Sequence, residues 1–178
     1  NFKTLGFEEV YFEDDMVHRK HYRNKNYISD SEAYQEIIQY LKEDESPAFI
    51  HFITMQNHLS YPKMDDLPVR YDIEGIEKDD LDDFEAYLQG ITDTDLETEQ
   101  FVERLRNFDK PVILVVYGDH HPPLYNDYLE NDLLGRYTTD YFIYTNMDVE
   151  TPASRVDPIS PVYLNNLVQE IASVRISP

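Results

Sequence analysis

An Asp-His pair directly after an apolar run is the strongest chemical signal in the sequence. Residues 111–117 are rich in β-branched side chains, and Gly118, Asp119 and His120 follow them. A carboxylate oxygen and an imidazole nitrogen that are adjacent on a sharp turn can reach one divalent cation. The end of a strand is also where α/β sheets bind their ligands. Asp-His is a common dipeptide, so a plain turn role for Asp119 is the alternative to a metal site.

A second loop presents polar side chains after another apolar run. Residues 48–55 are mainly apolar, and Asn57, His58 and Tyr61 come shortly after them. The His58 imidazole can donate to a phosphoryl oxygen or to a leaving group. A single loop histidine is more often a surface or packing residue. Two predicted strand ends that each deliver a histidine nevertheless favour a shared site.

The elements that must position these residues follow an α/β pattern. Residues 48–55, 111–117 and 141–145 are predicted strands, and residues 5–12 are a candidate for a fourth. Their continuous hydrophobicity is typical of central strands that are covered on both faces.

Three helical patterns separate or follow the predicted strands. They span residues 30–41, 92–105 and 161–171. Ser29 or Asp30 is the expected cap of the first helix, and a capping box from Thr92 to Asp95 is expected at the start of the second. Pro161 is expected in the first turn of the third. Alternating strands and helices predict an α/β domain whose mainly parallel sheet is sandwiched by helices.

Composition limits the possible functions. The chain has 178 residues, which is enough for one domain with a sizeable core. Its net charge of -21 argues against general nucleic-acid binding, because phosphate contacts need a basic face. No apolar run is long enough to span a bilayer. The absence of cysteine excludes disulfides and thiolate metal sites.

Charge is distributed unevenly along the chain. Residues 63–85 are strongly acidic, which is typical of a solvated face, and they lack the Asp-x-Asp-x-Asp-Gly spacing of a calcium loop. Residues 18–25 are basic instead. This basic segment either attracts an anionic lipid head group or a phosphate polymer, or it balances nearby acidic side chains.

Both polar loops resemble motifs of one enzyme family. Residues 118–120, with Pro-Pro-Leu at 122–124, resemble the Gly-Asp-His metal motif of the sulfatase/alkaline-phosphatase-like superfamily. Residues 54–62 resemble the Asn-His-x-x-Tyr loop of its lipoteichoic acid synthase branch, which comprises bacterial phosphoglycerol transferases. The resemblance extends over about residues 30–170 in outline and is specific at the two loops.

The resemblance implies roles for the residues of the two loops. Asp119 and His120 are the expected metal ligands, for Mn²⁺ with Mg²⁺ or Zn²⁺ as alternatives, and His58 is expected to contact the substrate phosphate. Asn57, Tyr61 and His121 are expected to bind substrate beside them. The family's glutamate ligand and threonine nucleophile belong upstream of residue 1, so no catalytic nucleophile is expected in this chain. The tryptophan that some members place near glycerol phosphate is absent, and residues 27–30 fall at about its position.

The resemblance also implies what the whole protein does. Residues 1–178 are expected to be the carboxyl-terminal part of a sulfatase-like catalytic domain with an alkaline phosphatase-like fold, and the first residue, an Asn rather than Met, agrees with a piece of a longer protein. The upstream threonine would attack an anionic phospholipid donor, release diacylglycerol and hold phosphoglycerol until a glycan or polymer hydroxyl accepts it.

The expected location is the extracellular face of a bacterial cell membrane, with a membrane anchor upstream of this chain. The isolated chain is expected to be inactive. A sulfatase or a phosphoethanolamine transferase of the same fold is the alternative, and a non-catalytic binding module is another.

Overall fold

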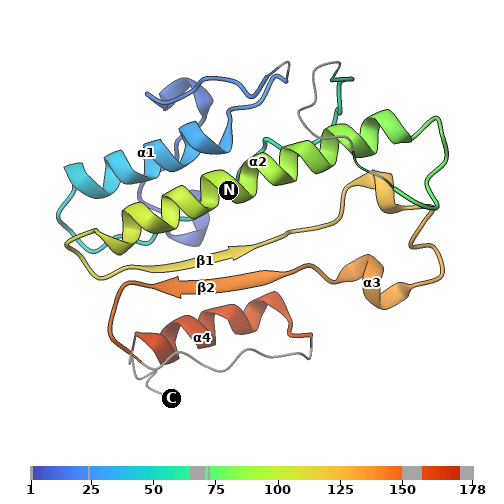
Figure 1. Cartoon of the computed structure of the whole chain (residues 1–178). Coiled ribbons are helices and arrows are strands. Elements are labelled where there is room, and N and C mark those ends of the chain that lie inside the picture. Colours follow the sequence, from blue (N-terminus) through green and yellow to red (C-terminus); the bar gives the residue numbers. More distant parts are fainter. Residues whose placement is uncertain (1, 24, 65–70, 72, 150–157, 173–178) are drawn as a thin grey trace. The chain divides into compact units, whose positions relative to one another are not determined.

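The computed structural model describes residues 2–23, 25–64, 71, 73–149 and 158–172 of the chain (Figure 1). The chain divides into two units, Asn1–Glu99 and Gln100–Pro178. The long helix α2 (Leu81–Arg106) contributes residues to both. Each unit is described by itself below.

Helix α1 (Asp30–Glu43) forms where the apolar spacing predicts it. The Ser29 side chain accepts a hydrogen bond from the Glu32 amide and caps the first turn, as expected. Ala33, Tyr34 and Ile38 lie on its buried face. The Tyr34 hydroxyl lies 2.8 Å from the Thr98 hydroxyl of α2. A side-chain cap, a narrow apolar face and a contact with α2 therefore all support this helix.

Helix α2 begins earlier than the sequence pattern predicts. It starts at Leu81, so the capping box expected at Thr92 and Asp95 is wrong. The Thr92 hydroxyl instead donates to the Leu88 carbonyl at 2.8 Å, one turn earlier in the same helix. A threonine can satisfy its hydroxyl in this way inside a helix, so its presence does not require a helix start.

Two of the predicted strands do not form. Residues 48–55 contain no strand, and Phe49 and Ile53 are 82% and 54% exposed. Residues 5–12 contain no strand either, and the 3₁₀ turn η1 (Phe2–Leu5) overlaps their start. A strand needs a hydrogen-bonding neighbour. Within the described part of the chain neither segment has one, whatever its β propensity.

The second unit contains one antiparallel pair of strands. Strand β1 (Ile113–Tyr117) pairs antiparallel with β2 (Tyr141–Thr145), from Ile113 opposite Thr145 to Tyr117 opposite Tyr141. Both strands were predicted, but the residues of β1 are half-buried or exposed rather than covered on both faces. The only sheet among the described residues is this antiparallel pair, so the mainly parallel sheet is not confirmed.

The remaining helices among the described residues are short. They are η3 (Pro123–Tyr125), α3 (Leu133–Tyr137), η4 (Pro161–Tyr163) and α4 (Leu164–Ile171) in the second unit, and η2 (Glu13–Asp15) in the first. Pro161 occupies the first position of η4, and α4 continues from it as predicted. Helix α4 buries Leu164, Leu167 and Ile171 and packs against β1. No helix among the described residues has the length and apolar character needed to cross a bilayer.

Asn146 ties the start of β1 to the end of β2. Its side-chain amide donates to the carbonyl oxygens of Leu105, Phe108 and Lys110 at 2.9–3.2 Å. Its side-chain oxygen accepts from the Val112 amide at 2.8 Å. One side chain therefore contacts four backbone groups around the turn between α2 and β1, with its two N–H bonds shared among three carbonyls.

We expect Asn146→Ala to loosen β1 selectively. The substitution leaves three partly buried carbonyl groups and one amide without this partner, so the free energy of local opening should fall by about 2 kcal/mol. Amide hydrogen exchange at residues 113–117 measures this change. Asn131→Ala, at an exposed position of the same unit, is the control. Unchanged exchange in Asn146→Ala would contradict the role given to this side chain.

Candidate functional site

The Asp119–His120 pair lies directly beyond the end of β1. The Gly118 amide donates to the Asp140 carbonyl, and the Thr139 hydroxyl donates to the Gly118 carbonyl at 2.5 Å. A Cβ atom at Gly118 would lie 3.0 Å from the Thr139 Cβ. A side chain at this position would therefore crowd the Thr139 side chain, which lies just before β2.

The geometry of the pair leaves two metal-binding atoms available. Asp119 Oδ2 lies 3.6 Å from His120 Nε2, and the two side chains are 73% and 61% exposed. Asp119 Oδ1 accepts from the His120 amide at 2.9 Å. His120 Nδ1 lies 2.8 Å from the His121 carbonyl oxygen, to which it donates when it carries the proton. That hydrogen bond leaves the Nε2 lone pair free, as in many metal-bound histidines.

These two atoms fit one divalent cation. Two ligands that are each about 2.1 Å from a tetrahedral cation lie about 3.4 Å apart, close to the observed separation. An oxygen and one imidazole suit Mn²⁺, Mg²⁺ or Zn²⁺. No cluster of three or more potential ligands occurs among the described residues. The part of the chain that the structure describes therefore supplies a fitting pair but not a complete coordination sphere.

His121 turns toward the backbone of α3. Its Nε2 lies 2.9 Å from the Gly135 carbonyl oxygen, and its ring lies 5.5 Å from the ring of Tyr125. Burial raises the pKa of the Tyr125 hydroxyl. His121 thus connects the turn that carries Asp119 and His120 to α3.

The second polar loop, residues 56–62, exposes His58 and holds its neighbours inward. His58 Nδ1 lies 3.3 Å from the Tyr27 hydroxyl, and the two rings meet edge to face at 5.6 Å. The Tyr61 hydroxyl donates to the Asn57 carbonyl at 3.0 Å. Asn57 and Tyr61 therefore shape the loop that carries His58.

The His58 loop approaches α2 at Gly90. The Asn57 side-chain oxygen lies where a Cβ atom would stand, 2.3 Å from its ideal position at residue 90. The Asn57 side-chain amide donates to the Thr94 hydroxyl at 2.8 Å. The hollow around this contact is lined mainly by the His58 loop, α2 and Lys25, and it is too narrow to admit a water molecule.

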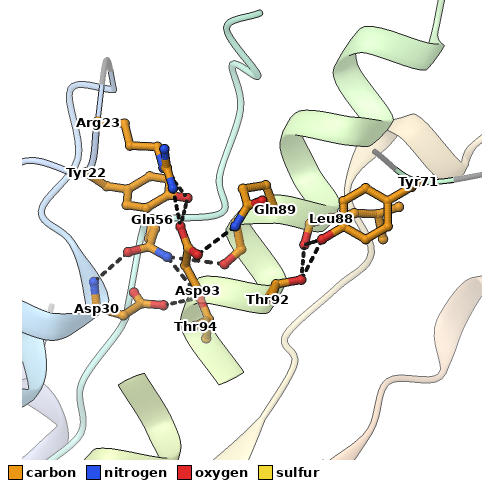
Figure 2. A network of polar contacts seen from close by, with 11 residues as sticks. Tyr22, Arg23, Asp30, Gln56, Tyr71, Leu88, Gln89, Thr92, Asp93 and Thr94 are labelled. Atoms are coloured by element: carbon orange, nitrogen blue, oxygen red, sulfur yellow. Dashed lines mark hydrogen bonds and ion pairs between the residues drawn. The ribbon is translucent and has the colours of Figure 1, made fainter. Parts of the chain in front are cut away.

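A buried polar network joins Gln56, at the start of the His58 loop, to α1 and α2 (Figure 2). The Gln56 side chain accepts from the Asp30 amide at 2.9 Å and donates to the Gly90 carbonyl and to the Thr94 hydroxyl. The Thr94 hydroxyl in turn donates to Asp30 Oδ2 at 2.5 Å. Asp30 is only 1% exposed, and its Oδ1 has no hydrogen-bond partner among the described residues. Burial raises the pKa of Asp30 to about 6, although the Thr94 hydrogen bond opposes this.

Lys25 is a member of this site that the sequence pattern does not reveal. Its side chain is buried, and its Nζ donates to the His58 carbonyl. Burial lowers the pKa of Lys25 to about 8. The sequence places it in a basic segment that is expected to be exposed, and no spacing rule distinguishes a buried lysine from its neighbours there.

The rest of the basic segment is largely paired within the first unit. The Tyr22 hydroxyl and the Arg23 guanidinium donate to Asp93 Oδ2 at 2.6 and 3.0 Å (Figure 2), and His21 lies 2.5 Å from Glu13. This agrees with the interpretation that residues 18–25 balance nearby acidic side chains. The acidic segment at 63–85 lies partly outside the described residues.

The two loops belong to different units. His58, Asn57 and Tyr61 lie in Asn1–Glu99, whereas Asp119, His120 and His121 lie in Gln100–Pro178. A shared site formed by both loops stays a prediction.

Comparison with known proteins gives a family match along nearly the whole chain. The family model described as Sulfatase matches residues 1–173. A putative cyclic beta-1,2-glucan modification protein of Rhizobium meliloti is 23% identical over 180 residues, which cover 92% of this chain and 28% of the relative. A lipoteichoic acid synthase of Staphylococcus saprophyticus is 32% identical over 99 residues, which cover 53% of this chain and 14% of the relative.

A solved structure is similar as well. It is the Streptococcus pyogenes phosphoglycerol transferase GacH in complex with sn-glycerol-1-phosphate, with 28% sequence identity and a TM-score of 0.67. The similarity covers 85% of this chain and 40% of that chain. The chain therefore spans less than half the length of each of these three proteins.

The buried Asp30 should make stability depend on pH. The pKa of Asp30 is about 6 in the folded state against an ordinary value of 3.8, so the folded state binds the proton more tightly. The stabilisation is present at low pH and is lost as pH rises through about 6, by up to about 3 kcal/mol. We expect Asp30→Asn to remove this contribution. The measurement is the midpoint of thermal unfolding between pH 4 and pH 7.

The matched control for this prediction is Asp95→Asn, which changes the same chemical group at an exposed position of α2. It should keep the pH dependence of the unmodified protein. Equal pH dependence in Asp30→Asn and the unmodified protein would show that Asp30 is not the group responsible.

Proposed function

The chain belongs to the sulfatase family, as a lipoteichoic acid synthase-like member of the sulfatase/alkaline phosphatase superfamily, and we propose that the protein carrying it is a metal-dependent phosphoglycerol transferase. The proposed reaction moves glycerol phosphate from an anionic phospholipid donor to a cell-surface glycan or polymer. It takes place at the extracellular face of a bacterial membrane. Residues 1–178 are the carboxyl-terminal portion of its catalytic domain in this proposal.

The Asp119–His120 pair is the observation that carries the proposal. Its two available ligand atoms lie at a separation that suits one cation, at the end of a strand. The similarity to a phosphoglycerol transferase over 85% of the chain supports a phosphoryl substrate. The lipoteichoic acid synthase supports a polymer acceptor. A sulfatase remains the rival within the family, and a sulfate ester as substrate in place of a phospholipid would distinguish it.

Asp119 and His120 would hold the cation in the proposed mechanism. Asp119 contributes Oδ2, and His120 contributes Nε2 while the His121 carbonyl accepts from its Nδ1. A bound Mn²⁺, Mg²⁺ or Zn²⁺ supplies Lewis acidity, which neutralises phosphoryl charge and lowers the pKa of a hydroxyl nucleophile. The family's threonine nucleophile is expected elsewhere in the protein.

His58 stabilises the phosphoryl group in this proposal. In the tautomer with the proton on Nε2, its Nδ1 accepts from the Tyr27 hydroxyl and Nε2 is free to donate to a phosphoryl oxygen. Asn57 and Tyr61 keep the loop in shape around it, and His121 borders the metal-binding turn. Each of the four residues is proposed to bind substrate.

We expect Asp119→Asn and His120→Gln, made in the full-length protein, to lower Mn²⁺ affinity by at least tenfold. Each removes one ligand from a site that needs both, so release of diacylglycerol from a phosphatidylglycerol vesicle should fall in parallel. Calorimetry measures the first quantity and lipid analysis the second.

Asp127→Asn is the matched control, because it changes the same group at an exposed position in the same stretch of chain. It should leave both measurements unchanged. Full Mn²⁺ affinity and full turnover in Asp119→Asn would contradict the proposal. Hydrolysis of a sulfate ester in place of diacylglycerol release would favour the sulfatase.

The chain of 178 residues alone should bind Mn²⁺ only weakly and show no transferase turnover. Two ligands are too few for tight binding, and the described residues offer no cluster of three. Calorimetry with the purified chain tests this expectation, with the full-length protein as the comparison. Micromolar affinity or measurable turnover would mean that the chain holds a complete site.

A further inference from the structure

We propose that Lys25 is a positioning residue for His58, and that its ammonium group adds the positive charge that an anionic substrate meets at the His58 loop. This inference rests on the proposed function, because it needs a phosphate-bearing substrate at that loop. It assigns a role to a residue outside both sequence motifs.

The Lys25 ammonium contacts the His58 loop at several points. Its Nζ donates to the carbonyl of His58 itself. It lies 4.9 Å from the centroid of the Tyr61 ring and 5.9 Å from that of the Tyr27 ring. Tyr27 in turn contacts the His58 imidazole. One side chain therefore holds both the backbone of His58 and the two tyrosines beside it.

A short closed loop delivers Lys25 to this position. The Lys25 amide donates to the Tyr22 carbonyl, and the Tyr22 amide donates to the Tyr27 carbonyl, each at 2.9 Å. The Tyr22 hydroxyl and the Arg23 guanidinium bind Asp93 of α2, as Figure 2 shows. Arg23 adopts a φ of 45°, which is uncommon for a residue other than glycine. The loop is thus fixed to α2 at one end while Lys25 reaches the His58 loop.

The charge of Lys25 has no carboxylate partner in the described part of the chain. The residue is 8% exposed, and none of the described carboxylates forms an ion pair with it. The groups that face it are Asp30 of α1, whose charge acts at longer range, and His58, Tyr27 and Tyr61. The faces of two tyrosine rings compensate only part of the cost of burying an ammonium group.

An anionic ligand at the His58 loop would offset this cost. A methionine would fill the same space without the desolvation penalty, so packing alone does not account for a lysine. Burial lowers the pKa of Lys25 to about 8, with the charge of Asp30 opposing the shift. The cation is present at pH 7 and is lost as pH rises above about 8. Binding that depends on it should weaken over the same range.

The test uses Lys25→Met and Lys25→Arg in the full-length protein, with sn-glycerol-1-phosphate as the probe ligand. We expect the unmodified protein to lose about tenfold in affinity between pH 7 and pH 9, because about nine-tenths of a group with a pKa of 8 is then deprotonated. Lys25→Met should bind about tenfold more weakly at pH 7 and show no such fall. Lys25→Arg should bind well at both pH values, because its guanidinium stays charged.

Lys20→Met is the matched control, since it removes the same charge from an exposed position five residues away. It should behave as the unmodified protein. Equal affinity in Lys25→Met and the unmodified protein would overturn the charge role of Lys25. The same fall with pH in Lys25→Arg and the unmodified protein would also overturn it.

A second measurement separates this inference from the proposed function. Amide hydrogen exchange at residues 57–61 should be faster in Lys25→Met and unchanged in Lys25→Arg, with no ligand present. Unchanged exchange in Lys25→Met would overturn the positioning role. If the unmodified protein bound no sn-glycerol-1-phosphate at either pH, the proposed function and the charge role would fall together, while the exchange result would still decide the positioning role.

Discussion

The hydroxyl group of Thr94 is the point on which the first unit depends. It donates to the carboxylate of Asp30 and accepts from the side-chain amides of Gln56 and Asn57, so its single proton and both lone pairs are used. These bonds join the first residue of α1, the middle of α2 and the start of the His58 loop. A buried hydroxyl with every hydrogen bond made fixes directions as well as distances. The exposed His58 ring is therefore carried on a rigid base.

In the second unit, side chains that hydrogen-bond to backbone groups hold both ends of β1 in place. Asn146 occupies the backbone groups of the turn before β1, and Thr139 binds the carbonyl of Gly118 at the other end of the strand. Both ends of β1 are thus set by side chains from the region of its partner strand. The carboxylate and imidazole that follow are exposed, because the turn positions them without burying them. Rigid support beneath exposed polar groups is a common arrangement in binding sites.

The sequence predicts local features well and pairing poorly. The cap of α1, the helix after Pro161 and the strands at 113–117 and 141–145 follow from capping chemistry, proline geometry and β-branched runs, all of which act within a few residues. Residues 48–55 have the same apolar character but no strand, because pairing depends on a partner that a run of residues does not specify. The motifs single out Asp119, His120 and His58 as site residues, and that assignment stays a prediction. They give no sign of Lys25 or Thr94, whose roles arise from contacts between distant segments.

The close approach of the His58 loop restricts which residue α2 can carry at position 90. Glycine within a helix costs about 1 kcal/mol relative to alanine, yet α2 carries one near the middle of its length. An added Cβ atom would collide with the Asn57 side chain, so any larger residue would push the loop away from the helix. The glycine thus lowers the intrinsic stability of α2 and allows the His58 loop to pack closely against it. Substitution at this position is accordingly restricted by Asn57, which is distant in sequence. A residue with higher helix propensity there would weaken the packing between α2 and the His58 loop.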